Sequence, residues 1–493
     1  MGSFLSITKK YKMLLLASFV LVLLNFGIDY SFQYATDTYS TVNETGTWYH
    51  IIFSNGRPLK ALIFWAFEVT RVPFGFVYHF SHFLAIIFLA IAVAVFAVML
   101  QHYVSSSWLC VAISFMILAN PFSIEFMLFE EMGLFMLIIL LNVIAVWVTE
   151  KRWREKKTDG LAWDIAIIQI CMWISVSLYQ TGVLSYVVLM LPFIVIYSES
   201  VRDFWYKNLF VAAMMGIPLG CAYILAAFFL PVDRLDNNLD LVGKIKNFWN
   251  IFRFVTFEEF YNVGRGIFLA WIVVLLVAVV CGIMAMSMGI TKHILAVIYI
   301  MVGCVVTSFL LYITGSSTVC WPRMIYTYGM LFGIVSIYLL YELGLSTFKS
   351  ADVARALIIG LTVFIIFYDY IGFGKVFLER HRANQEDLYY AKIIGQRIEE
   401  YEQETGHAIN TLCYYKDHHI AVFSEGFDKT MLSERAQASG WSRHNSIEIY
   451  LNRKFEQGES DPELQEMFSE KDWNMYSEEQ LVFDGNKLHI CVY

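Results

Sequence analysis

KKYKMLLLASFVLVLLNFGI, residues 9–28, is the stretch that decides the fold. Three lysines precede an apolar run that extends from Met13 to Ile28 without a charged residue. The run resembles the core of a signal peptide, but no small-residue cleavage site follows it. We therefore interpret it as an uncleaved first membrane span whose basic flank stays in the cytoplasm.

The composition of the whole chain agrees with this interpretation. Of 493 residues, 58% are hydrophobic and only 16% are charged, whereas soluble domains carry about 25% charged residues. A chain this long and this apolar is an integral membrane protein rather than one large soluble core. Its net charge of -8 provides no basic surface for nucleic acid.

Apolar runs of membrane-spanning length recur as far as residue 371. They predict a polytopic α-helical membrane protein with about eleven transmembrane helices. An odd number of spans that begins inside the cytoplasm ends outside it. The predicted spans are Tyr11–Ile28, Phe76–Leu100, Trp108–Ala119, Met132–Thr149, Leu161–Leu178, Val183–Tyr197, Asn208–Leu230, Gly266–Met288, Ile294–Ile313, Met324–Leu343 and Arg355–Ile371.

The distribution of lysine and arginine supports this topology. The predicted inner connections are rich in both, whereas the short outer turns after the third, fifth and ninth spans hold only Arg323. This asymmetry is the positive-inside bias of membrane proteins. Arg57, Lys60 and Arg71 lie on the outer side against that bias, so they need another role.

The predicted topology also places many polar residues on the outer face of the membrane. Polar groups at membrane depth are costly and usually functional. The residues placed on this face are Asp37, Arg57, Glu68, Glu125, Glu130, Glu131, Tyr179, Gln180, Asp233, Asp236, Arg265 and Arg323.

The composition changes at residues 372–374, and the chain is polar beyond them. We therefore predict a transmembrane domain over residues 1–373 and a small extracytoplasmic α/β domain over residues 374–493. Its predicted helices are Val376–Glu404, Lys429–Ala438 and Pro462–Glu470, and its predicted strands are Ile409–Tyr415, Ile420–Phe423, Ile447–Leu451 and Leu488–Val492. In an oxidising compartment, Cys413 and Cys491 of this domain are candidates for a disulfide.

Chemistry is concentrated in the first outer loop, DYSFQYATDTYSTVNETGTWYHIIFSNGRPL, residues 29–59. Asp37 is the candidate catalytic base; the alternative is a solvated loop acid or a helix N-cap. Arg57 precedes Pro58, which suits the first position of a helix over Pro58–Val72. The guanidinium of Arg57 can donate two parallel hydrogen bonds to a phosphate. The alternative for Arg57 is an interfacial arginine that reaches toward water.

Further candidates lie in the other outer turns. Arg323, in WPRM, is a second candidate for binding a phosphate. Glu130 and Glu131 are adjacent acids at a span entry, and Glu125 precedes them. These acids could pair with Arg57 or Arg323, bind sugar hydroxyls or hold a divalent cation; the alternative is a hydrated cap at the membrane interface. Tyr179 and Gln180, in LYQTG, are candidates for contact with a sugar. The histidines and cysteines show no metal-ligand spacing, so we predict no metal site and no certain cofactor.

The chain shows neither of the common nucleotide-binding glycine motifs in a strand–helix context. Nucleotide sugars are cytoplasmic, so a sugar donor for the outer face would be linked to a polyprenyl phosphate. Transfer from such a donor needs a base for the acceptor hydroxyl, a cation for the leaving phosphate and an apolar groove for the lipid.

Several stretches resemble the serotype-converting O-antigen glucosyltransferases of bacteria and phages, of the glucosyltransferase-II type, which have a GT-C-like membrane architecture. The similar stretches are DTYSTVNETGTWYHIIFSNGRPL, NPFSIEFMLFEEMGLFML, SLYQTG and WPRMIY. The resemblance implies transfer of glucose from undecaprenyl-phosphate-glucose to a surface polysaccharide at the outer face of the bacterial cytoplasmic membrane. It also implies that Asp37 is the catalytic acid residue of the first loop. Relatives often carry paired acids there, whereas this chain has Thr36 before Asp37.

One base and one cradle for the leaving group favour a single displacement with inversion at the anomeric carbon. Two other functions remain open. A transporter or flippase for lipid-linked sugars would also need a lateral groove and charged cavity groups, but would place polar groups along the whole path. A non-catalytic scaffold of envelope assembly would leave the outer cluster of carboxylates and arginines without a role.

Overall fold

The computed structural model describes residues 11–27, 34–43, 52–53, 56–229, 241–257, 271–273, 275–277, 279–280, 290–310, 312, 321–346, 349–416, 435–470 and 477–492. The chain divides into two compact units. The membrane unit comprises Met1–Tyr30 and Thr47–Phe373, and the C-terminal unit comprises Ser31–Gly46 and Gly374–Tyr493. Residues 31–46, which the sequence assigns to the membrane domain, therefore group with the C-terminal unit.

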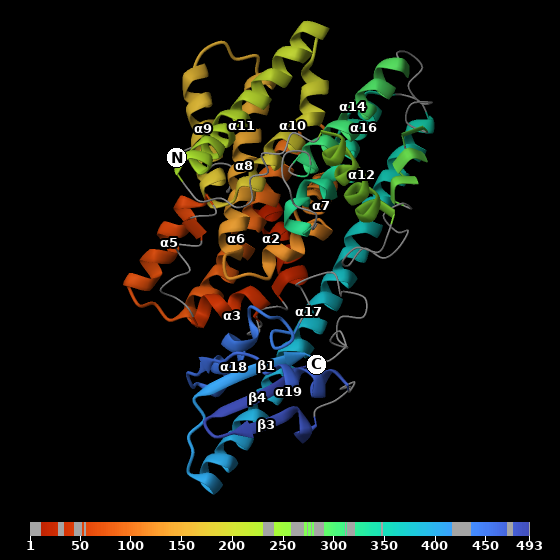
Figure 1. The fold of residues 1–493 in the computed structure, drawn as a ribbon. Helices are drawn as coiled ribbons and strands as arrows, with labels where there is room; N and C mark the ends of the chain where they lie inside the picture. Colours follow the sequence, from red (N-terminus) through yellow and green to blue (C-terminus); the bar gives the residue numbers. More distant parts are fainter. Residues whose placement is uncertain are drawn as a thin grey trace. The chain divides into compact units, whose positions relative to one another are not determined.

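The membrane unit is a bundle of apolar helices (Figure 1). Helix α6 (Phe74–Leu100) packs against both α2 (Lys12–Phe26) and α8 (Met132–Arg154). The other elements of the unit are α5 (Pro58–Val69), α7 (Ser107–Leu118), η2 (Pro121–Met127), α9 (Leu161–Leu178), η3 (Gln180–Val183), α10 (Leu184–Tyr197), α11 (Val201–Phe229), α12 (Leu241–Phe257), α14 (Ile290–Ser308), η4 (Pro322–Met324), η5 (Tyr326–Met330), α16 (Leu331–Leu345) and the first part of α17 (Lys349–Thr405).

Within the described ranges, eight helices are long and apolar enough to cross a membrane, or nine if a bent pair counts as one span. The protein is thus a polytopic helical membrane protein, as the sequence predicts. The first predicted span corresponds to α2, a shorter apolar helix of 15 residues. The eighth predicted span, Gly266–Met288, lies mostly outside the described residues. The number of eleven spans therefore stays a prediction.

The predicted short third span is a broken element. Helix α7 ends at Leu118, and η2 continues after a bend of 65°. Pro121 occupies the first position of η2, where a proline is tolerated but cannot extend the preceding helix. Asn120 is fully buried and caps η2 by accepting a hydrogen bond from the Phe122 amide at 3.1 Å. After this break, the acidic stretch of residues 125–131 leads from η2 to the start of α8.

Small residues let the helices of the membrane unit approach closely. Gly333 of α16 faces α7, and a Cβ atom there would overlap the side chain of Ile117. Small residues at helix contacts are the usual basis of packing between membrane helices, where lipid removes the hydrophobic drive for association.

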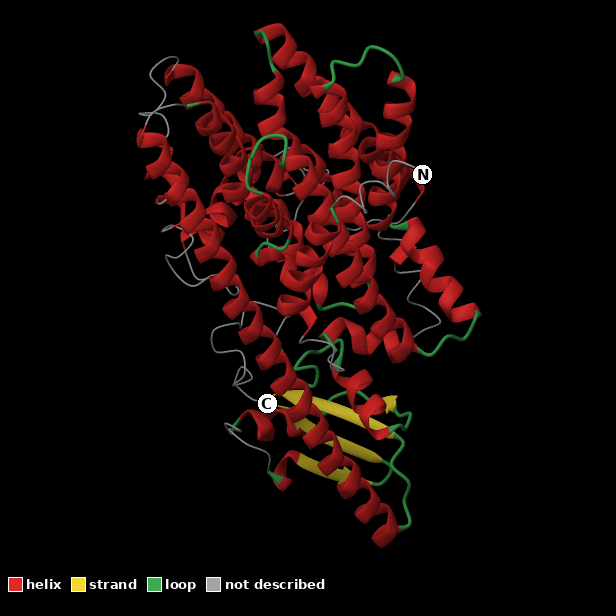
Figure 2. Ribbon diagram, turned by 180° about the vertical axis from the view of Figure 1, so that it is seen from behind, coloured by secondary structure: helices red, strands yellow, loops and turns green. Residues whose placement is uncertain are grey.

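The C-terminal unit is built around a four-stranded sheet (Figure 2). The strands are β1 (Thr411–Lys416), β2 (Glu456–Gln457), β3 (Leu481–Asp484) and β4 (Lys487–Val492), in the order β2-β1-β4-β3. Strand β1 pairs in parallel with β2 and β4, whereas β3 and β4 form an antiparallel hairpin. The two-residue turn of that hairpin begins at Gly485, whose φ of +56° suits glycine.

Helix α17 supplies the main apolar partner of this sheet. Ile394 and Ile398 pack with residues of β1 and β4 and with Ile447 of α18 (Arg443–Leu451). A second apolar cluster of this unit contains Phe468 of α19 (Pro462–Ser469), which packs against Tyr415 of β1. The boundary between the two units falls within α17, at Phe373 and Gly374.

Two predictions for the C-terminal domain are wrong. The predicted strand Ile447–Leu451 is part of helix α18, because a helix places Ile447 in the core and turns Tyr450 toward α3 (Thr36–Asn43), whereas a strand would point these two side chains to opposite faces. Cys413 on β1 and Cys491 on β4 are both buried, and no disulfide joins them.

Two further predictions lie wholly or partly beyond the described ranges. The predicted strand Ile420–Phe423 lies outside the described residues, as does most of the predicted helix Lys429–Ala438. Residues 435–438 of that helix form a turn instead.

The close approach of α16 and α7 can be tested by substitution. Gly333→Ala should lower the stability of the protein by about 1–3 kcal/mol, because the added methyl group forces Ile117 out of its position. The measurement is thermal unfolding of the purified full-length protein in detergent. Gly344→Ala, in the same helix but with nothing within 4 Å of its Cβ position, is the matched control. Equal melting temperatures for both variants would contradict this packing.

Candidate functional site

Four short segments of the membrane unit bring the predicted polar residues together. They are the start of α5, the turn between η2 and α8, the junction of α9 and η3, and the turn η4. We call the residues that they contribute the ionic cluster: Arg57, Lys60, Glu125, Glu130, Glu131, Tyr179, Gln180 and Arg323.

The start of α5 presents Arg57. Gly56 has a φ of +73°, which reverses the chain before the helix, and Arg57 occupies the N-cap position in front of Pro58. The side-chain amide of Gln180 donates a hydrogen bond to the Gly56 carbonyl oxygen at 2.7 Å. The Arg57 guanidinium carbon lies 4.5 Å from the center of the Tyr179 ring. A cation–π contact of this kind orients the guanidinium while its N–H groups remain able to donate in the plane.

Lys60, one turn further along α5, forms a buried ion pair with Glu131. The two residues are 4% and 8% exposed. Burial opposes the charge on the carboxyl, but the ammonium of Lys60 and the guanidinium of Arg57 outweigh it and hold the pKa of Glu131 below its usual range. The ion pair therefore fixes α5 to the start of α8.

Arg323 of η4 is clamped by Glu125 of η2. The carboxylate accepts a hydrogen bond from the Arg323 backbone amide at 2.7 Å and another from its guanidinium. Glu125 is fully buried, so this charge depends on the arginine for its partner. The guanidinium also lies over the rings of Phe129 and Trp321, at 5.1 and 5.6 Å. The clamp holds the turn η4 against η2.

Aromatic rings connect the two arginine positions. The Tyr179 ring contacts Phe135 edge-on at 5.1 Å and Phe126 at 6.3 Å, and Phe126 contacts Tyr326 at 5.1 Å. On the same junction, Thr181 donates a hydrogen bond to the Arg323 carbonyl oxygen at 3.4 Å. These contacts make the segments one packed assembly rather than separate interfacial residues.

The cluster holds three cations, Arg57, Lys60 and Arg323, and three carboxylates, Glu125, Glu130 and Glu131. Glu130 is 3% exposed, and its charge acts on Lys60. The formal charges of the cluster thus balance.

Sequence reasoning identified most of the cluster and missed two of its ion-pair partners as site residues. Glu125 was considered with Glu130 and Glu131 as an acid able to pair with Arg57 or Arg323, without being chosen as a site residue, and it does pair with Arg323. Lys60 was noted only for its place on the outer side against the charge bias, and that departure was the signal for its partner Glu131. No three His, Cys, Asp or Glu side chains gather as a metal site in the part of the chain that the structure describes. The divalent cation considered for Glu130 and Glu131 thus gains no ligand set there.

Asp37 belongs to the other unit. It lies in the first turn of α3, where the helix dipole favours an ionised carboxylate, and its Oδ1 accepts a hydrogen bond from the Trp441 indole at 3.0 Å. The side chain is partly exposed. The expected approach of Asp37 to Arg57 and Arg323 stays a prediction.

The buried ion pair of α5 can be tested by removing one partner. Lys60→Met should destabilise the protein by about 3–5 kcal/mol, because it leaves the Glu131 carboxylate buried without its ammonium partner. The double variant Lys60→Met/Glu131→Leu should recover much of that loss, because it removes the unpaired charge as well. The measurement is thermal unfolding in detergent at neutral pH. A double variant no more stable than Lys60→Met would contradict a pairwise interaction.

Comparison with known proteins identifies the family of the chain. A family model described as Glucosyl transferase GtrII matches residues 30–334, which include Asp37 and every residue of the ionic cluster. No curated protein and no solved structure matches the chain significantly. Because the matched region covers more than half of the 493 residues, the chain is a member of the GtrII glucosyl transferase family.

Proposed function

We propose that the protein transfers glucose from a polyprenyl-phosphate-linked donor to a surface polysaccharide, such as O-antigen, at the outer face of the bacterial cytoplasmic membrane. The family supports membrane glucosyl transfer. The observation that carries the proposal is the ionic cluster of the membrane unit, in which the Tyr179 ring orients the guanidinium of Arg57. The N-terminus is cytoplasmic and the C-terminal unit extracytoplasmic in this proposal, as the positive-inside bias indicates.

Arg57 is suited to the phosphate because negative charge grows there during the reaction. A sugar phosphodiester carries one negative charge, and its phosphate carries nearly two after the sugar has left. A preorganised cation stabilises the second charge most in a site from which water is excluded. Arg323 is the second phosphate ligand, with its position fixed by Glu125. Glu130, Glu131, Tyr179 and Gln180 support the site by pairing, stacking and hydrogen bonding.

The chemical step is a single displacement. Asp37 accepts the proton of an acceptor hydroxyl, and the hydroxyl oxygen forms a bond with the anomeric carbon of glucose. The bond between that carbon and the phosphate oxygen breaks, and its electron pair stays on the phosphate. The products are a glucosylated polysaccharide with inverted anomeric configuration, polyprenyl phosphate and a protonated Asp37.

Exposed apolar faces beside the cluster support a lipid-linked donor. On α5, Leu62, Trp65 and Val69 lie on one face with exposed fractions of 55%, 45% and 60%, while Lys60 points inward. Their spacing of three and four residues makes a continuous apolar stripe. Such a helix lies at the boundary between lipid and headgroups, next to the phosphate of a polyprenyl carrier.

The role of Arg57 can be measured through the donor. Arg57→Ala should reduce kcat/KM for polyprenyl-phosphate-glucose by about 10²–10³-fold, because it removes the charge that stabilises the leaving phosphate. The assay uses full-length protein in vesicles with radiolabelled donor. Arg71→Ala removes the same charge at the exposed end of α5 and should stay close to wild type. An equal loss of kcat/KM in both variants would show that any positive charge near α5 has this effect, and would contradict a specific role of Arg57.

Asp37 is tested through the product. Asp37→Asn should lower glucosylation of the surface polysaccharide by at least about 10²-fold while expression and membrane insertion remain normal. Composition analysis of the polysaccharide from cells with each variant provides the measurement. Asp352→Asn, an exposed acid at the start of α17, is the control. Full glucosylation by Asp37→Asn would exclude Asp37 as the base. Movement of labelled lipid across vesicles without any new glycosidic bond would instead favour a transporter.

A further inference from the structure

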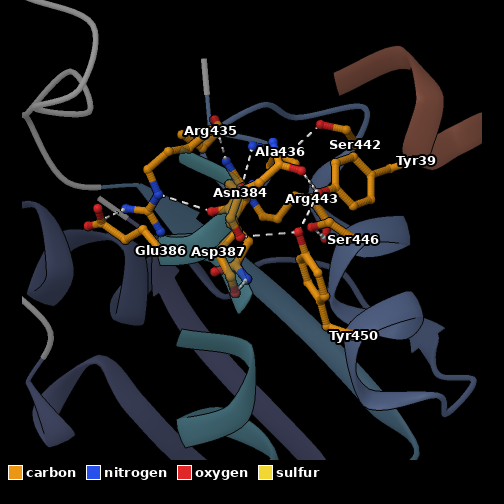
Figure 3. A network of polar contacts seen from close by, with 12 residues as sticks. Tyr39, Asn384, Glu386, Asp387, Arg435, Ala436, Ser442, Arg443, Ser446 and Tyr450 are labelled. Carbon is orange, nitrogen blue, oxygen red and sulfur yellow. Dashed lines mark hydrogen bonds and ion pairs between the residues drawn. The ribbon is translucent and has the colours of Figure 1, made fainter. Parts of the chain in front are cut away.

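Within the C-terminal unit, the amide side chain of Asn384 holds the start of the helix that carries Asp37. Asn384 of α17 donates a hydrogen bond to the Tyr34 carbonyl oxygen at 3.1 Å and accepts one from the Tyr34 amide at 3.0 Å. It also accepts a hydrogen bond from the Tyr39 hydroxyl at 2.9 Å. Tyr39 is 1% exposed and contacts Tyr450 of α18 through the hydroxyl and the ring. Figure 3 shows this meeting point of α3, α17 and α18.

One turn further along the same face of α17, Asp387 holds a second segment, residues 435–442. Asp387, three positions after Asn384, accepts hydrogen bonds from Arg435 Nε at 3.0 Å and from the Ala436 amide at 2.7 Å. Asp387 and Arg435 are 1% and 2% exposed. A buried pair of charges with this geometry is costly to break, so it anchors the start of the segment 435–442 firmly (Figure 3).

The end of the same segment is anchored as well. The Ser442 hydroxyl donates to the Ala436 carbonyl oxygen at 2.9 Å, and Arg443 Nε donates to the Gln437 carbonyl oxygen at 2.6 Å. Trp441 stands between these anchors, and its indole N–H donates to Asp37. Although both chain neighbours on its C-terminal side are buried, Trp441 itself is 50% exposed. The indole is therefore held in place and yet presents much of its surface.

We propose that the C-terminal unit binds the acceptor: Asn384 positions the Asp37 helix, and the exposed indole of Trp441 binds the acceptor sugar beside Asp37. This inference rests on the proposed function, because it takes Asp37 as the base. A base must lie within hydrogen-bond reach of the hydroxyl that it deprotonates, so the acceptor occupies the immediate surroundings of Asp37. A carboxylate accepts several hydrogen bonds at once, so the bond from Trp441 leaves it able to accept another.

The chemistry of the indole fits a sugar ring. A sugar has polar edges and less polar faces formed by its C–H groups, and a rigid aromatic ring offers a flat apolar surface with a polar end. The N–H group of Trp441 fixes the orientation of the ring through Asp37. The partner is thus a hydroxyl-bearing saccharide, and the same residue that binds it also orients the base.

Two substitutions of Trp441 separate binding from positioning. Trp441→Ala removes the ring and should raise the acceptor KM about tenfold or more, with the donor KM unchanged. Trp441→Phe keeps a ring but loses the N–H donor, so it should lower kcat several-fold while the acceptor KM stays near wild type. The experiment uses full-length protein in vesicles, radiolabelled polyprenyl-phosphate-glucose, and unmodified surface polysaccharide purified from a host strain that lacks this gene.

Trp163→Ala is the matched control, because Trp163 is a 77% exposed tryptophan of α9, which belongs to the membrane unit. It should change neither constant. An unchanged acceptor KM in Trp441→Ala, with Asp37→Asn inactive, would overturn the acceptor role of Trp441 and leave the proposed function standing. Transfer by Asp37→Asn at the wild-type rate would overturn the proposed base and this inference with it.

Asn384→Asp provides an independent readout of positioning. It removes the amide donor to Tyr34 while it keeps the size of the side chain. The expected result is a lower kcat with an unchanged donor KM, because the Asp37 helix is displaced while the phosphate site is not. A donor KM that rises in parallel with the loss of kcat would contradict a purely positioning role.

Discussion

The cost of burying charge determines how the turns that hold the ionic cluster are arranged in the membrane unit. An ionised group in an apolar bundle loses several kcal/mol of hydration and is tolerated only when an opposite charge and hydrogen bonds replace the water. Glu125 and Glu131 are 0% and 8% exposed, and each is matched by one cation from another segment. These two pairs fix η4 to η2 and α5 to α8, so electrostatics joins three regions that are distant in the sequence: α5, the η2–α8 region and η4. The position of Arg57 follows from the second pair, since it lies one turn before Lys60.

Charge balance in this cluster has a consequence for catalysis. A site with an excess of positive charge would bind the phosphodiester and the product phosphate tightly, and product release would then be slow. In the proposed reaction, a balanced cluster would bind the singly charged donor weakly through the guanidinium groups of Arg57 and Arg323. It would stabilise the additional charge of the leaving phosphate more than the single charge of the donor. Interactions that strengthen toward the transition state are those that accelerate a reaction.

Periodicity and charge bias were sufficient to predict the membrane class, most helix positions and the gathering of Arg57, Glu130, Glu131, Tyr179, Gln180 and Arg323 on one side of the bundle. Both signals arise from the bilayer, which acts on every span in the same way. The pattern around Ile447 was misread because its local alternation favours a strand, whereas the contact of Tyr450 with α3 requires a helix. A local sequence pattern around Tyr450 contains no information on its contact with Tyr39, which lies more than 400 residues away.

The same limit explains why residues 31–46 group with the C-terminal unit. Their sequence follows a membrane span directly, and nothing in it indicates hydrogen bonds to Asn384, 350 residues further along the chain. Closing so long a loop costs conformational entropy, although that cost grows only slowly with loop length. The gain is specific: the helix with the candidate base is held by buried amide and phenol groups rather than by lipid. In the proposed reaction, the base and the acceptor surface would then belong to one packed α/β unit.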